Sequence, residues 1–294
     1  MLNTELLNCR IINGVVRFLN QPMLLLLILA LVLSSCGALS EAEKYFRAGE
    51  LSQEQDQHDD AVREYSQAIE LDSSFTTAYV YRALAYIYSG EYGLAIDDCS
   101  RAIQLNQNTT FAYVHRAWAY NENGQYDLAI VDCNKAIELD SNIPEPYVNR
   151  AWAYIGNGEY DLAIIDCNRA IQIEPNMATA YVNRAFAYIS DGQYGLAIAD
   201  CNQAILIDPT LAIAYINRAW AYLIEGQYDL VIADCSKAIE LDSSQPEPYI
   251  NRALAYKENG QYDLAIADCN KVIEISQDPY LVNEARYIIQ QIDN

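Results

Sequence analysis

Residues 178–211, ATAYVNRAFAYISDGQYGLAIADCNQAILIDPTL, are the stretch from which the fold of this 294-residue chain can be predicted. Similar stretches recur at the same spacing at residues 76–109, 110–143, 144–177, 212–245 and 246–279, and a degraded copy occupies residues 42–75. A unit of this size is too small to bury its own apolar side chains, so neighbouring copies must pack against each other. We therefore predict an array of seven repeats.

Each unit has the pattern of two helices joined by a short turn. In the stretch quoted above, Tyr181, Ala185 and Tyr188 follow one another at steps of four and three residues, which places them on one helix face. Gly192 then interrupts the pattern, and glycine suits the left-handed backbone that often ends a helix. A second periodic run covers residues 197–204. The unit is therefore helix, turn, helix.

This pattern closely resembles the tetratricopeptide repeat. That family favours an aromatic residue at position 4, small residues at 8 and 20, tyrosine near 11 and 17, alanine at 27 and often proline at 32. Counted from Ala178, these positions hold Tyr181, Ala185, Ala197, Tyr188, Tyr194, Ala204 and Pro209. The resemblance implies an all-α, right-handed superhelical solenoid, and residues 280–294 are expected to add one capping helix after the last repeat.

Position 7, where the family favours leucine, holds arginine in all six well-matched units. We expect Arg150 on the first helix of its unit to reach Asp166 on the second helix, as the equivalent residues would in the other units. Such a charge-assisted pair is strong in itself. Desolvation opposes it, however, so its net contribution to stability is expected to be near zero. We interpret the pairs as a device that fixes how the repeats stack.

Position 24, usually aromatic in the family, is cysteine in the same six units. The residues are Cys99, Cys133, Cys167, Cys201, Cys235 and Cys269. Equivalent points of successive hairpins lie beyond the roughly 7 Å that a disulfide can bridge, and the chain has no paired ligand motif for a metal. We interpret these cysteines as small apolar core residues, with a redox or metal-binding role as the alternative.

The resemblance places a binding groove on the first helices, chiefly at positions 2, 5, 6, 9, 12 and 13. Position 6 holds Asn149, Asn183, Asn217 and Asn251, position 9 holds Trp118, Trp152, Phe186 and Trp220, and position 5 includes Val148, Val182 and Ile216. An asparagine offers both a donor and an acceptor, so an evenly spaced row suits an extended peptide. Tryptophan is enriched at binding hot spots. The alternative is that the asparagines merely tolerate a solvated face and the aromatic rings pack between repeats.

The N-terminal residues have a different composition. Residues 1–35 are expected to be a signal peptide of the lipoprotein type, because Met23–Leu33 (MLLLLILALVL) is apolar but short for a membrane span. Leu33–Cys36 (LSSC) resembles a bacterial lipobox, which implies lipid attachment at Cys36 and a tether over residues 36–41. The protein would then be exported and anchored at the cell envelope. An uncleaved signal anchor and a cytoplasmic protein are the alternatives.

The formal net charge of −22 disfavours nucleic acid as a partner, because phosphate groups would be repelled. His58 and His115 lie in unrelated contexts, and we find no nucleophile motif or phosphate-binding loop in the sequence. We predict no enzymatic activity, no cofactor and no metal. The expected function is to hold an extended or helical segment of another protein in the groove. The alternatives are an accessory subunit that recruits an envelope enzyme, and a self-assembling structural protein.

Overall fold

The computed structural model of this protein describes residues 39–293. The predicted signal peptide and Cys36 lie outside these residues. The described part is all-α, with fifteen helices from α3 to α17, and none of them is long and apolar enough to cross a bilayer. Internal contacts divide the chain into two units, and the boundary between them in the sequence falls between Ala78 and Tyr79.

The first unit contains α3 (Glu41–Glu54) and α4 (His58–Leu71). The first turn of α3 is closed by a capping box, in which Ser40 Oγ accepts from the Glu43 backbone N–H at 3.1 Å while a Glu43 oxygen accepts from the Ser40 N–H at 2.7 Å. Between the two helices, the buried ring of Tyr65 packs against Phe46 with ring centroids 5.5 Å apart. This degraded repeat therefore still forms a helical hairpin.

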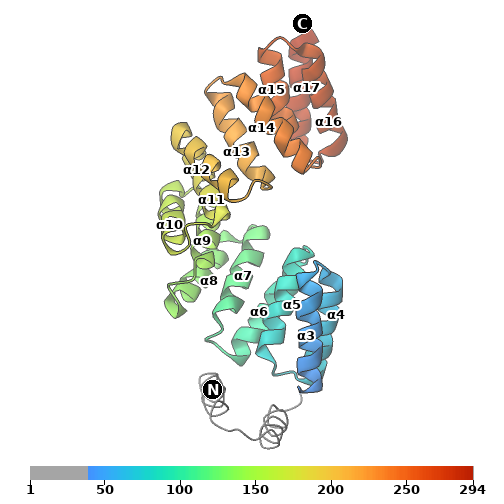
Figure 1. Ribbon diagram of the computed structural model, residues 1–294, viewed down its shortest axis with the longest axis vertical. Coiled ribbons are helices and arrows are strands. Elements are labelled where there is room, and N and C mark those ends of the chain that lie inside the picture. The colour runs from blue at the N-terminus through green and yellow to red at the C-terminus, as the bar shows by residue number, and fades with distance from the viewer. Residues whose placement is uncertain (1–38, 294) are drawn as a thin grey trace, which may run out of the picture. The chain divides into compact units, whose positions relative to one another are not determined.

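The second unit holds the well-matched repeats, in which first and second helices alternate (Figure 1). Its first helices are α5 (Thr76–Tyr88), which begins just before the boundary between the units, α7 (Thr110–Glu122), α9 (Glu145–Gly156), α11 (Ala178–Ser190), α13 (Ala212–Ile224) and α15 (Glu247–Glu258). Its second helices are α6 (Tyr92–Leu105), α8 (Tyr126–Leu139), α10 (Tyr160–Ile173), α12 (Tyr194–Ile207), α14 (Tyr228–Leu241) and α16 (Tyr262–Ile275). The final helix, α17 (Pro279–Asp293), has no second-helix partner.

Each helix of this unit packs on the next one along the chain from α6 onward, and from α7 to α17 each odd-numbered helix also contacts the next odd-numbered helix. The first helices therefore form one continuous layer. Helix α17 packs on both α15 and α16, and its Ala285 and Ile288 are buried against Tyr249 and Cys269. The prediction of an all-α solenoid that ends in an additional helix is confirmed.

The turn inside each of the six well-matched repeats is closed by the predicted glycine. Gly192 has a φ of 77°, and the five equivalent glycines are also left-handed. Its N–H donates to the Ile189 carbonyl at 3.0 Å, and the next N–H, of Gln193, donates to the Tyr188 carbonyl at 2.7 Å. These bonds satisfy carbonyls that the end of α11 would otherwise leave without a partner.

The six cysteines are buried free thiols packed among small residues. Cys201, for example, lies in a cluster with Ala185, Ala197, Ile189 and, from the next repeat, Ala221. Burial raises the pKa of the Cys201 thiol to about 12, so the group stays protonated near neutral pH. The interpretation of these residues as core positions is confirmed.

The predicted arginine–aspartate pairs are also present. Arg150 donates from Nε and Nη2 to the two carboxylate oxygens of Asp166, both at 2.7 Å, and these bonds raise the pKa of the guanidinium. The third nitrogen, Nη1, donates to Asn134 of the preceding repeat. The rings of Tyr147 and Tyr154 lie 5.8 and 5.9 Å from the guanidinium carbon. The arginine thus joins two helices of its own repeat and one of its neighbour.

The same bidentate pair recurs in each of the other well-matched repeats. The pairs are Arg82–Asp98, Arg116–Asp132, Arg184–Asp200, Arg218–Asp234 and Arg252–Asp268. Each aspartate is buried, so it depends on its arginine for a countercharge.

Replacing one partner of such a pair is expected to lower the free energy of unfolding more than replacing both partners. The variant Arg184→Leu leaves Asp200 buried without its countercharge, which we expect to lower the free energy of unfolding by about 3–5 kcal/mol while the array remains folded. In the double variant, with Asp200→Leu added, most of this loss should be recovered. Urea unfolding followed by circular dichroism measures both values. A double variant no more stable than the single one would contradict a near-zero net contribution of the pair.

Candidate functional site

A row of aromatic side chains crosses three neighbouring first helices. Trp152 of α9, Phe186 of α11 and Trp220 of α13 occupy the same repeat position. Their ring centroids are 6.3 and 6.1 Å apart, and the rings are tilted by 60° to each other in both pairs. Trp152 is 39% exposed and Trp220 is 37% exposed, so packing between repeats accounts for only part of their surface. We call these three residues the aromatic row.

Trp118, the remaining aromatic candidate, has other contacts. Its ring packs edge-on against Tyr88 with centroids 5.6 Å apart, and its Nε1 donates to Glu122 at 3.3 Å. The structure therefore places Trp118 in a pair on α5 and α7, outside the aromatic row.

The aromatic row continues into a cavity of about 440 Å³ between α11, α13, α15 and α17. It is lined by Phe186, Ile213, Ile216, Asn217, Trp220, Leu223, Gln245, Glu247, Ile250, Asn251, Leu254, Tyr280, Leu281 and Glu284. We call it the C-terminal cavity. Five of the predicted binding residues line it: Phe186, Ile216, Asn217, Trp220 and Asn251. The other candidates in the repeats, including Asn149 and Val182, lie elsewhere in the array.

The capping helix supplies lining residues that were not among the predicted binding residues. Tyr280, Leu281 and Glu284 all lie on α17 and contribute to the wall of the cavity. Their sequence fits a helix that covers the last repeat, and nothing in it distinguishes a lining residue from a packing residue. Glu247, in the first turn of α15, occupies position 2, which the family resemblance does assign to the groove.

Two of the four asparagines make contacts within the array. Asn149 Nδ2 donates to the Val114 carbonyl at 3.1 Å, and Asn183 Nδ2 donates to the Val148 carbonyl at 3.4 Å. Each bond ties one first helix to the preceding one. The side chain of Val148 is itself buried among residues of the interface between repeats, as is that of Val182. In Asn149 and Asn183 these bonds leave the side-chain oxygen and the second N–H of the amide unused.

Asn217 lies at the same position one repeat further on and differs from both. It is only 2% exposed, and its Nδ2 has no hydrogen-bond acceptor. A buried donor without a partner costs about 1–3 kcal/mol. Asn217 also lines the C-terminal cavity. The row of asparagines is thus regular in sequence but irregular in bonding.

His115 occupies the asparagine position in α7. Its Nδ1 lies 3.4 Å from the Val80 carbonyl, so that nitrogen must carry the proton if it donates there. Burial lowers the pKa of His115 to about 4, and the contact with the carbonyl only partly opposes this shift. The imidazole is therefore neutral near pH 7, and its contact with the preceding first helix indicates a packing role.

This burial predicts a pH-dependent stability that the variant His115→Asn should lack. The pKa of His115 in the folded chain, about 4, lies below its ordinary value of 6.5, so between these values the unfolded chain binds the proton more tightly. The free energy of unfolding should therefore fall by up to about 3 kcal/mol as the pH is lowered through this range. Asparagine is the natural control, since it fills the same position in four later repeats. Urea unfolding at several pH values should show the difference between the two proteins growing towards acid, and parallel curves would contradict the prediction.

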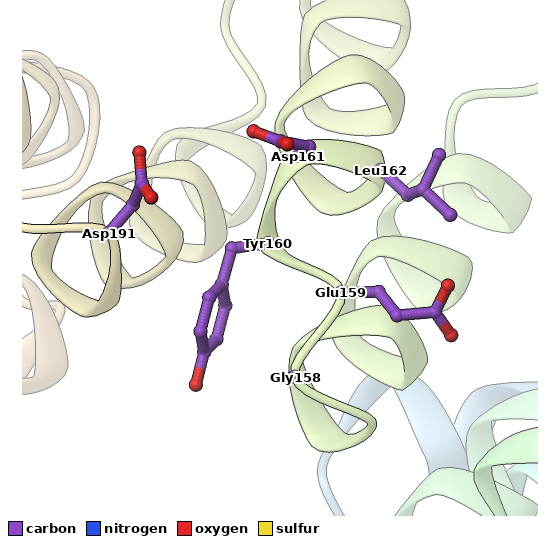
Figure 2. A pocket seen from close by; sticks show the side chains of 6 residues that line it. All are labelled: Gly158, Glu159, Tyr160, Asp161, Leu162 and Asp191. Atoms are coloured by element: carbon purple, nitrogen blue, oxygen red, sulfur yellow. The ribbon is translucent and has the colours of Figure 1, made fainter.

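A second hollow of about 390 Å³ lies at the turn between α9 and α10 and is lined by acidic residues. Figure 2 shows Asp191 approaching from α11, while Glu159, Tyr160 and Asp161 lie on the segment that enters α10. Between the two preceding repeats, the side-chain amide of Asn157 donates to Asp127 at 3.1 Å. One repeat later the equivalent residues are Asp191 and Asp161, and the carboxylate of Asp191 has no N–H to donate to Asp161. Within residues 39–293 no group of side chains is suited to hold a metal ion, and this hollow includes none of the predicted site residues.

The sequence patterns of the tetratricopeptide repeat family match most of the chain. The matched residues are 46–108, 111–143, 144–177, 178–211, 212–245 and 246–279. No catalytic domain is among these matches. No curated protein sequence matches the chain.

Several solved structures share the fold. A tetratricopeptide repeat protein from Parabacteroides merdae has a TM-score of 0.64 at 17% sequence identity, over 86% of this chain and 99% of that one. For pilF of Pseudomonas aeruginosa the TM-score is 0.62 at 14% identity, over 74% of this chain and 98% of that one. For the APC/C hetero-tetramer Cut9-Hcn1 the TM-score is 0.72 at 15% identity. That match covers 85% of this chain but only 46% of the other chain, so this chain spans about half its length.

Similarity at these identities concerns the fold alone. The family matches go further, because they cover well over half of the sequence and coincide with the helical hairpins described above. The chain therefore belongs to the tetratricopeptide repeat family of protein-interaction scaffolds.

Proposed function

We propose that this protein holds an extended or helical segment of another protein along the layer of first helices, with the aromatic row and the C-terminal cavity as the main contact surface. The observation that carries this proposal is the pair of exposed tryptophans, Trp152 and Trp220, which lie on either side of Phe186. Phe186 and Trp220 also line the cavity. Large aromatic rings left partly exposed next to a cavity supply much of the binding energy at protein interfaces.

The predicted asparagines would have a smaller part in this interaction. Asn149 and Asn183 already use one of their two side-chain N–H groups inside the array, so each could offer a peptide its oxygen, as an acceptor for a backbone N–H, and its second N–H. Such contacts would orient a segment without reading its side chains. The aromatic row and the cavity would then provide most of the affinity.

The variant Trp220→Ala is expected to weaken binding of the partner segment at least about tenfold without unfolding the array, because it removes a ring that is only partly buried. A photo-crosslinking residue at Ile213, an exposed position that lines the cavity, would identify the segment. Calorimetric titration of that segment then measures the loss. Leu206→Ala is the matched control, since Leu206 is an exposed apolar residue on the second helix α12. Equal affinities for Trp220→Ala and the unaltered protein would count against the groove.

The identity of the crosslinked protein separates the proposed scaffold from its alternatives. Several partners, or a structural one, would support a scaffold. A single enzyme would support an accessory subunit that recruits it, and crosslinks only to other copies of this chain would support self-assembly.

We further propose that the protein acts at the cell envelope, anchored by lipid at Cys36. The support is the sequence alone: the apolar run Met23–Leu33 followed by the lipobox-like Leu33–Cys36. Because few residues separate Cys36 from the start of α3 at Glu41, the first repeat would lie close to the membrane surface.

The mass of the intact mature protein tests the anchor. We expect a loss of residues 1–35 together with an added mass that corresponds to lipid, and no such addition in the variant Cys36→Ala. A mass equal to the whole unmodified chain would contradict the lipoprotein and favour a signal anchor or a cytoplasmic protein.

A further inference from the structure

We propose that the C-terminal cavity selects segments in which an apolar side chain stands next to lysine or arginine, and that Asn217 donates a hydrogen bond to a carbonyl group of the bound segment. This inference rests on the proposed function, because it assigns a ligand chemistry to the same groove.

The apolar part of the ligand is indicated by the cavity wall. Phe186, Ile216, Trp220, Ile250 and Leu281 converge on it from four helices. The volume of about 440 Å³ lies in the range typical of pockets that enclose part of a ligand, which is roughly 300–1,000 Å³. Burying an apolar side chain there would remove it from water and would also cover the exposed surface of Trp220.

The basic part of the ligand is indicated by charge. Glu247 of α15 and Glu284 of α17 line the cavity, and no lysine or arginine is among its lining residues. Within the lining, therefore, no positive charge offsets these two carboxylates, and the whole chain carries a formal net charge of −22. An acidic or phosphorylated segment would be repelled at this site, whereas a basic side chain beside the apolar one would be attracted.

The third observation is the amide of Asn217. In the two preceding repeats the equivalent Nδ2 donates to a backbone carbonyl of the neighbouring helix. In Asn217 this donor has no acceptor although the residue is 2% exposed, and the residue lines the cavity. A carbonyl oxygen of a bound segment would supply the missing acceptor. A carboxylate could also accept this bond, but Glu247 and Glu284 would oppose its charge.

Three matched synthetic peptides test the proposal on the full chain. All are short, capped at both ends and labelled with fluorescein. Leucine alternates with lysine in the first peptide, with serine in the second and with glutamate in the third. Fluorescence anisotropy measures their affinities. We expect the lysine peptide to bind at least about tenfold more tightly than the serine peptide, and the glutamate peptide to bind most weakly.

Two double variants distinguish a local charge effect from general attraction to an acidic protein. Glu247→Gln with Glu284→Gln should reduce the affinity for the lysine peptide to near that for the serine peptide. Glu138→Gln with Glu240→Gln changes the net charge equally at exposed positions of α8 and α14, outside the cavity, and should keep the preference. Equal loss of the preference in both double variants would overturn the proposal.

The variant Asn217→Leu tests the hydrogen bond. It should weaken the binding of the lysine peptide and of the serine peptide by a similar factor, about fivefold, so that the ratio of their two affinities stays the same. Unchanged affinity in this variant would remove Asn217 from the ligand site.

The outcomes also separate this inference from the proposed function. If the lysine and serine peptides bind equally and Trp220→Ala weakens both, the groove binds peptides and the charge selection is wrong. If none of the three peptides binds, the ligand chemistry proposed here is wrong, and the function then depends on whether Trp220→Ala weakens the crosslinked partner segment. If that segment is also unaffected, both proposals are wrong.

Discussion

A helical hairpin of this size leaves most of its apolar side chains in water unless another hairpin packs against it. That constraint organises the second unit of the structure. Small residues such as Ala185, Cys201 and Ala221 allow one hairpin to approach the next closely. In the five repeats from residue 110 to residue 279, an arginine also reaches the preceding repeat. The last repeat has no following hairpin, and α17 covers its apolar face instead. The layer of first helices, and with it any groove, is a consequence of this stacking.

Much of the fold could be predicted because residues with the same structural role recur at the same position of each repeat. A glycine at the same place in six units, such as Gly192, indicates the same left-handed turn six times. An arginine in place of leucine, followed by an aspartate on the next helix, predicts the pair formed by Arg150 and Asp166. These predictions depend on contacts within a unit or between identical neighbours, and spacing along the sequence specifies such contacts well.

The candidate site could be predicted only in part, because it depends on differences between repeats. Asn183 and Asn217 occupy equivalent positions in nearly identical sequences, yet one donates to a carbonyl and the other has no acceptor. A small change in how two helices approach each other decides between these outcomes, and periodicity does not encode it. The cavity likewise needs Glu284 and Leu281 of α17, a helix outside the repeat pattern. Binding residues predicted by position alone therefore include some, such as Val182, whose side chains are used in packing.

The buried thiols have a consequence for biosynthesis. Each well-matched repeat carries one cysteine, and all six are sealed in the folded array. Before the hairpins stack, the same six sulfur atoms are open to oxidants and can combine in many incorrect pairings. In a compartment that promotes disulfide formation, the yield of correctly folded chain would depend on whether the hairpins stack faster than the thiols are oxidised. Local contacts between neighbouring hairpins form quickly compared with long-range ones, so this architecture favours stacking over oxidation.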